Sequence, residues 1–155
     1  MKGMRDGILR MAGAAMLVGL LGSGCATNRG ILNVQVEKTK NPSEGRTVTI
    51  VSVNDARVFE EAPRVSSTPS LKGAEITDKS ITSRAIARKR NGFGKAMGDI
   101  LLPEGRTVEQ LVREALVKSF RDSGYRVLEA GEVAADGEKA IPVEADIEQF
   151  WSWCT

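Results

Sequence analysis

Few side chains in this 155-residue chain could carry out chemistry, because it contains no histidine and only two cysteines, Cys25 and Cys154. The absence of histidine excludes Ser-His-Asp and Cys-His catalytic arrangements, a His-liganded zinc site and an activating base for Cys154. The carboxylates of Glu144, Asp146 and Glu148 could ligate a hard cation, but no glycine-bounded ligand loop accompanies them, so we favour a solvated strand face. We therefore expect no catalytic residues, no metal site and no enzymatic activity.

Cys25 follows a segment with the composition of an export signal. Three basic residues within the first ten precede eleven uncharged residues at 11–21, about half the length of a membrane-spanning helix. Small residues at 22–24 then lead into Cys25. This arrangement resembles the lipobox of bacterial lipoproteins, in which the cysteine sulfur receives a diacylglycerol, the signal is removed and the new amino terminus is acylated. The resemblance implies a covalent lipid on Cys25 and no other cofactor. The alternative is an ordinary signal peptide, with Cys25 a plain thiol.

The lipobox resemblance predicts how the chain is organised and where it resides. Three acyl chains on one cysteine anchor a protein permanently to a membrane. Ala26, which follows the cysteine, favours transfer to the outer membrane, by resemblance to the sorting of enterobacterial lipoproteins. We expect no nucleic-acid partner, because a net charge of +2 is too small for one. The expected organisation is a lipoprotein signal peptide at 1–24, a lipidated tether at 25–30, and a single periplasmic domain at 31–155 on the periplasmic face of the outer membrane.

The clearest structural element is a helix over 107–123. Thr107 and Gln110 form a capping box, one face of the segment is apolar, and Gly124 occupies the position of a left-handed C-cap. A helix with one apolar face must cover a sheet. We therefore expect an α+β fold, in which a mixed β-sheet has this helix packed on one face. The expected strands are 31–36, 47–53, 125–129, 141–155 and a hairpin within 81–97, whereas 60–80 is expected to be a long surface loop.

The charges of the chain separate into two segments. Six basic and no acidic residues lie between Lys79 and Lys95, whereas 129–148 holds seven acids and one lysine. Two solvated faces, or an attraction within the protein, would account for this separation. The functional alternative is an anionic partner for the hairpin, such as phosphate-bearing lipid headgroups, cell-wall polymer or an acidic protein. The hairpin is expected to turn at Asn91-Gly92 in a type I′ turn, and its candidate binding residues are Arg84, Arg88, Lys89, Arg90, Phe93 and Lys95.

The last segment of the sequence is unusually aromatic. Residues 141–155 alternate as one long strand would, and three of the seven aromatic residues, Phe150, Trp151 and Trp153, lie within the final six positions. Chain termini are ordinarily loose and exposed. We therefore expect either that a partner covers this candidate edge or that the domain is incomplete at its C-terminus.

Several motifs of the sequence occur in a recognisable order. The lipobox is followed by a β-branched strand leading into Asn54-Asp55-Ala56-Arg57, a basic hairpin, a helix ending in Ser123-Gly124-Tyr125-Arg126-Val127, and the segment 144–151. This ordered set resembles the YajG-like family of bacterial lipoproteins. The helix with its following Gly-Tyr-Arg-Val is also similar to the α/β unit of the TolB amino-terminal domain and of CsgG-like lipoproteins. The resemblance implies no catalytic residues, and it implies a truncated chain, because family members continue with a further strand and a final helix.

These observations predict a lipid-anchored periplasmic lipoprotein of the bacterial cell envelope, acting as a non-catalytic binding or assembly module. The alternative is an auxiliary subunit of an envelope transport or cell-wall synthesis complex. Such a subunit would dock through its C-terminal strand by adding that strand to a partner's sheet.

Overall fold

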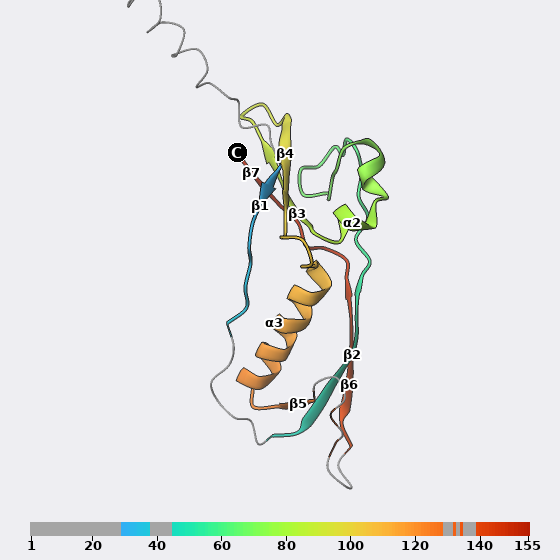
Figure 1. Ribbon diagram of the computed structural model, residues 1–155, viewed down its shortest axis with the longest axis vertical. Helices are drawn as coiled ribbons and strands as arrows, with labels where there is room; N and C mark the ends of the chain where they lie inside the picture. The colour runs from blue at the N-terminus through green and yellow to red at the C-terminus, as the bar shows by residue number, and fades with distance from the viewer. Residues whose placement is uncertain (1–28, 38–44, 129–131, 133, 135–138) are drawn as a thin grey trace, which may run out of the picture.

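The strands of this protein form two sheets, with one long helix packed against one of them (Figure 1). The computed structural model describes residues 29–37, 45–128, 132, 134 and 139–155. The expected α+β class is confirmed, although the strands divide between two sheets where the sequence predicted one. The expected signal peptide, Cys25 and most of the tether lie outside the described residues.

The first sheet has three parallel strands in the order β5-β2-β6. Its central strand β2 (Thr47–Asp55) and the edge strand β5 (Arg126–Leu128) confirm the strands expected at 47–53 and 125–129. The other edge strand, β6 (Ile141–Ile147), alternates between side chains that are at least half-buried and exposed ones. The exposed positions on β6 are Pro142, Glu144 and Asp146, so one face of this sheet meets solvent.

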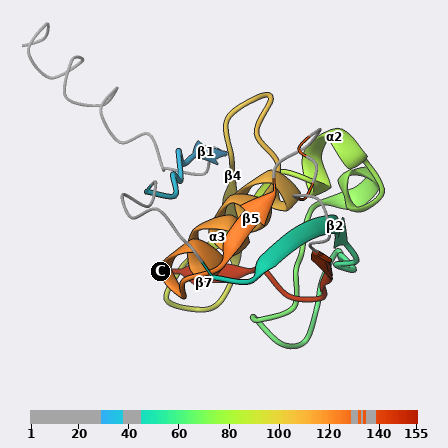
Figure 2. The same cartoon turned by 90° about the horizontal axis from the view of Figure 1, so that it is seen from below.

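The helix α3 (Val108–Asp122) covers the opposite face of this sheet and confirms the expected helix. The Thr107 hydroxyl accepts a hydrogen bond from the Gln110 amide at 3.2 Å, and the Gln110 side-chain oxygen accepts one from the Thr107 amide at 3.0 Å. Gly124 has a φ of +85°, as expected of a left-handed C-cap. Seen from below, α3 runs alongside β5 and β2 (Figure 2). Buried side chains between helix and sheet form the larger core, which includes Val48, Ile50, Val53, Leu102, Val108 and Leu111.

The second sheet is mixed and has the order β1-β4-β3-β7. Its centre is the expected hairpin, in which β3 (Ala85–Arg90) pairs antiparallel with β4 (Ala96–Leu101). The turn differs from the predicted type I′. The Asn91 carbonyl accepts a hydrogen bond from the Gly94 amide at 2.8 Å, and Gly94 rather than Gly92 has the positive φ, at +79°. The Asn91 side-chain oxygen accepts from two further amides of the loop, which favours this longer turn.

Two expected strands are shorter than the sequence predicted. β1 covers only Gly30–Ile31, which pairs parallel to β4. The strand is short because the chain then leaves the sheet, and Val34 and Val36 pack on the larger core. The expected continuous strand 141–155 is wrong. β6 ends at Ile147, and the chain crosses to the other sheet, where β7 (Ser152–Cys154) pairs parallel with β3.

The segment 60–80 is only partly the surface loop expected. It contains a 3-10 helix, η1 (Gly73–Ile76), and its last two residues begin a short helix, α2 (Lys79–Thr82). Leu71 is completely buried. It packs with Phe59, Ala85 and Leu101 in a second core beside the mixed sheet, against which Trp151 also lies. The loop is held to the fold because it supplies this apolar side chain.

Candidate functional site

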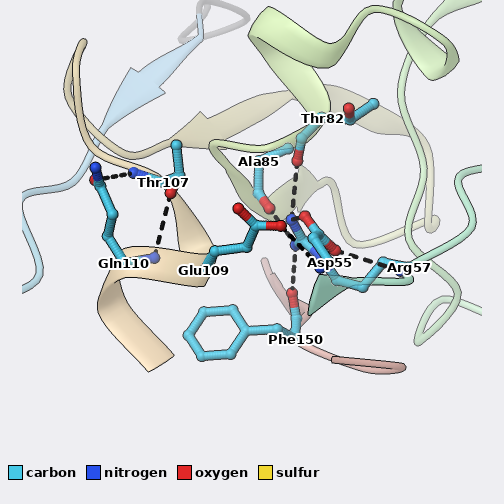
Figure 3. Close-up of polar contacts among 8 residues, drawn as sticks. All are labelled: Asp55, Arg57, Thr82, Ala85, Thr107, Glu109, Gln110 and Phe150. Carbon is cyan, nitrogen blue, oxygen red and sulfur yellow. Dashed lines mark hydrogen bonds and ion pairs between the residues drawn. The ribbon is translucent and has the colours of Figure 1, made fainter. Parts of the chain in front are cut away.

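A buried ion pair lies where the two sheets meet. The Arg57 side chain has no exposed surface and that of Asp55 is 10% exposed. The Asp55 carboxylate accepts two hydrogen bonds from the Arg57 guanidinium, from Nε at 2.7 Å and from Nη2 at 2.6 Å (Figure 3). Such a two-point pair fixes the plane of the guanidinium as well as its position. The two residues are two positions apart in an extended segment, so their side chains leave the same side of the chain.

The remaining Arg57 donors bind three backbone carbonyls, two from the stretch 82–85 and one from residue 150 (Figure 3). Nη1 donates to the carbonyls of Ala85 at 2.6 Å and Phe150 at 3.0 Å, and Nη2 donates to that of Thr82 at 2.9 Å. A guanidinium has five N–H donors. All five of Arg57 are therefore used within the protein, and none remains for a ligand.

Further contacts connect the Asp55–Arg57 ion pair to α3 and to the second core. We call the ion pair and the carbonyls that Arg57 binds the buried node. The Asp55 amide donates to the Glu109 carboxylate in the first turn of α3 at 3.0 Å. On the other side, the Arg57 guanidinium carbon lies 5.2 Å from the centre of the Phe59 ring. These contacts join the helix, both sheets and both cores, so we assign the pair a structural role.

A second group of charges surrounds Asp99 on β4. Its carboxylate lies 3.1 Å from Arg29 and 3.3 Å from Arg88, and Arg29 also contacts Glu75 at 2.9 Å. Burial lowers the pKa of Arg29, but the hydrogen bonds and charges of Asp99 and Glu75 outweigh it and raise that pKa. Arg88 is itself buried and donates to the Ser70 carbonyl at 2.8 Å. The Arg88 charge is therefore balanced inside the fold.

The structure divides the six residues of the candidate hairpin. Arg84 is half-buried and donates from Nε to the Leu102 carbonyl at 3.0 Å, and Arg88 is buried against Asp99. In contrast, Phe93 at the tip of the hairpin is 98% exposed. The cations that lie near this tip are the exposed Lys95 and the half-buried Lys89 and Arg90.

The candidate C-terminal edge is also divided. Phe150 packs half-buried against the larger core, and its carbonyl accepts from Arg57. The Trp151 ring meets Phe59 edge to face, with 5.8 Å between ring centres. The third aromatic residue, Trp153, is 50% exposed. Two of the three aromatic side chains are thus covered by the protein's own cores.

The acidic residues of β6 do not converge on a common point. Glu144 and Asp146 are exposed on the solvent face of the strand, where the Asn54 amide donates to Asp146 at 3.0 Å. Within the described part of the chain, no group of three potential metal-ligating side chains occurs. In that same part, no helix is both long and apolar enough to cross a membrane.

The sequence contains one signal for this buried ion pair, which the expected site residues do not include. In Asn54-Asp55-Ala56-Arg57 an acid and a base two residues apart follow a strand, so their side chains share one side of the chain. The carbonyls that Arg57 binds carry no sequence signal, because any residue has one. No family model matches this sequence, and no curated protein or solved structure matches it either.

Proposed function

We propose that this protein is a lipid-anchored lipoprotein on the periplasmic face of the outer membrane, where it acts as a non-catalytic binding or assembly module of the cell envelope. The observation that carries the proposal is Cys25, preceded by a basic segment, an apolar run and three small residues. The short separation along the chain between Cys25 and the first contact within the fold supports the proposal. Arg29, the fourth residue after Cys25, is already bound to Asp99 on β4, so a lipid on Cys25 would be attached directly to the folded domain.

The chemistry of the side chains supports a binding rather than a catalytic role. The sequence has no histidine, and the most deeply buried ion pair, Asp55 with Arg57, uses all five guanidinium donors on the protein itself. That pair serves to hold the fold together.

Replacing Cys25 by serine is expected to release the protein from the membrane, because the hydroxyl cannot take the place of the thiol as lipid acceptor. The measurement is fractionation of cells after an alkaline wash, with mass spectrometry of the amino-terminal peptide for acyl chains. Cys154→Ser is the matched control and is expected to stay in the membrane fraction, since Cys154 is an exposed thiol at the far end of the chain. Retention of Cys25→Ser would disprove the anchor.

One observation favours the second candidate, an auxiliary subunit that docks through its C-terminal strand. β7 is an edge strand that pairs with β3 on one side, and all three of its residues are exposed. An edge strand offers unpaired backbone groups to the strand of a partner.

A photo-crosslinking amino acid at Trp153 is expected to form a discrete adduct with one envelope protein if β7 docks in this way. The same amino acid at Val58, which is 75% exposed but lies outside the strands, is the control and is expected to give none. Both samples would be examined by mass spectrometry after irradiation of intact cells. Absence of an adduct at Trp153, in protein that is still in the membrane fraction, would reject the subunit hypothesis.

A further inference from the structure

The tip of the β3–β4 hairpin presents an apolar ring beside positive charges. Phe93 is 98% exposed between two glycines. Lys95 is exposed next to it, and Arg90, which donates to the Gly94 carbonyl at 2.9 Å, precedes the turn. From residue 84 to residue 98 the sequence contains no acid. An exposed aromatic side chain among cations is the composition of a segment that binds at a membrane surface.

The chain enters the fold from the direction of this tip. β1 is parallel to β4, with Gly30 opposite Ile100, and β4 itself runs away from the tip. Arg29, which precedes β1, therefore lies on the tip side of Gly30, where it contacts Asp99. Figure 1 shows β1 beside β4 at the upper end of the molecule, where the hairpin turns.

The length of the tether sets how far the tip can stand from the anchor. The four residue steps from Arg29 back to Cys25 span at most about 14 Å. The four steps along β4 from Asp99, which Arg29 contacts, back to Lys95 rise about 13 Å. An anchor at Cys25 therefore keeps the membrane surface within about the distance that separates Arg29 from the hairpin tip.

The charges on this end of the molecule match an anionic surface. A Cβ atom on Gly30 would lie 3.2 Å from the Lys89 Nζ, which places that ammonium beside the first residue of β1. Because Gly30 stands opposite Ile100, that ammonium is further from the turn than Asp99, and the cations at the tip itself are Arg90 and Lys95. Anionic phospholipids attract such juxtamembrane cations, and a covalent anchor holds the two surfaces at a high effective concentration.

We propose that the hairpin tip docks on the phospholipid surface to which Cys25 is anchored, with Phe93 in the interfacial layer and Arg90 and Lys95 at the lipid phosphates. The proposal rests on the proposed lipidation of Cys25 and names the partner of the candidate hairpin. It also orients the molecule, because the three-stranded sheet and α3 then point away from the membrane (Figure 1).

The test uses the full lipidated chain in vesicles of phosphatidylethanolamine and phosphatidylglycerol. Phe93→Cys and Val51→Cys are made in a Cys154→Ser background, and a water-soluble maleimide measures the accessibility of each thiol in vesicles and in detergent. Val51 is the matched control, since it is an apolar residue that is 54% exposed on β2, in the other sheet. We expect the vesicles to slow labelling severalfold for the Phe93→Cys variant and not at all for the Val51→Cys variant.

The contribution of the cations is tested in the same assay. Adding Lys95→Glu to the Phe93→Cys variant, or replacing the vesicles by pure phosphatidylcholine, is expected to restore most of the labelling rate. Equal protection in phosphatidylcholine would overturn the role assigned to Arg90 and Lys95.

The proposed lipidation of Cys25 and the proposed docking of the hairpin tip can be refuted separately. Equal labelling of the Phe93→Cys and Val51→Cys variants, in protein that floats with the vesicles and carries acyl chains on Cys25, would overturn the docking of the tip and leave the anchor standing. An unacylated Cys25 with no flotation would refute the proposed function, and the docked tip with it.

Discussion

Replacing Arg57 by alanine is expected to cost about 3–5 kcal/mol of folding free energy, because it removes one partner of a buried ion pair. The substitution leaves the Asp55 carboxylate, whose side chain is 10% exposed, without its two charge-assisted hydrogen bonds. It also leaves the carbonyls of Thr82, Ala85 and Phe150 without a donor. Since single domains are stable by only about 5–15 kcal/mol, this loss would remove a large share of the folding free energy.

Urea unfolding followed by circular dichroism measures this loss, and two further variants make it specific. Arg57→Lys keeps the charge but has only three donors in place of five, so we expect a smaller loss than for alanine. Arg84→Ala removes a half-buried guanidinium from the same region, one that donates to the Leu102 carbonyl, and is expected to cost little. An unfolding midpoint for Arg57→Ala equal to that of Arg84→Ala would show that the node does not hold the sheets together.

The elements that could be predicted from the sequence are those determined by neighbouring residues. The helix is specified by its capping box at Thr107 and Gln110, its apolar face and Gly124, all within one local segment. The hairpin is specified by two strand-like runs around Asn91. Its turn type was mispredicted, because Asn-Gly fits several turns and the side chain of Asn91 selected the one with Gly94 in the left-handed region.

The division into two sheets could not be predicted, because it depends on contacts between distant residues. An alternating run at 141–155 is compatible with one long strand or with two strands in different sheets. The bond from Arg57 to the Phe150 carbonyl, which joins residues 93 positions apart, lies where the chain leaves β6 and crosses to β7. The same crossing carries Trp151 to the second core, against Phe59.

The six basic and aromatic residues of the candidate hairpin do not form one surface, and the pleat of the strand explains why. Successive side chains of a strand point to opposite faces, so Arg88, Lys89 and Arg90 cannot all lie on one side. Arg88 stands opposite Asp99 in the register of β3 and β4, and the pair is buried. Cross-strand pairing with an acid was visible only once the register was known.

The second large effect is expected for Leu102→Ala, at about 2–5 kcal/mol, because the side chain is completely buried and its removal leaves a cavity. Leu102 packs with Val108 and Leu111 in the larger core, while the preceding residue, Leu101, packs in the second core. The Leu102 amide also donates to the Arg84 carbonyl at 2.8 Å, which fixes the chain between β4 and α3. The control is Leu32→Ala, where the side chain is 50% exposed and the expected loss is much smaller.

Two spectroscopic probes show whether Leu102→Ala destabilises both sheets together or only the sheet that α3 covers. Ellipticity reports mainly on α3, which packs on the larger core, and tryptophan fluorescence reports on the second core and β7, through Trp151 and Trp153. Leu101 and Leu102 are adjacent in the chain but pack in different cores, and the hydrogen bonds of Arg57 join the same two regions. We therefore expect both signals to change at one urea concentration, in Leu102→Ala as in the wild type. Loss of the helical signal at a lower concentration than the tryptophan signal would mean that the two sheets unfold independently. In that case the buried ion pair would only position the sheets, and would not make them one cooperative unit.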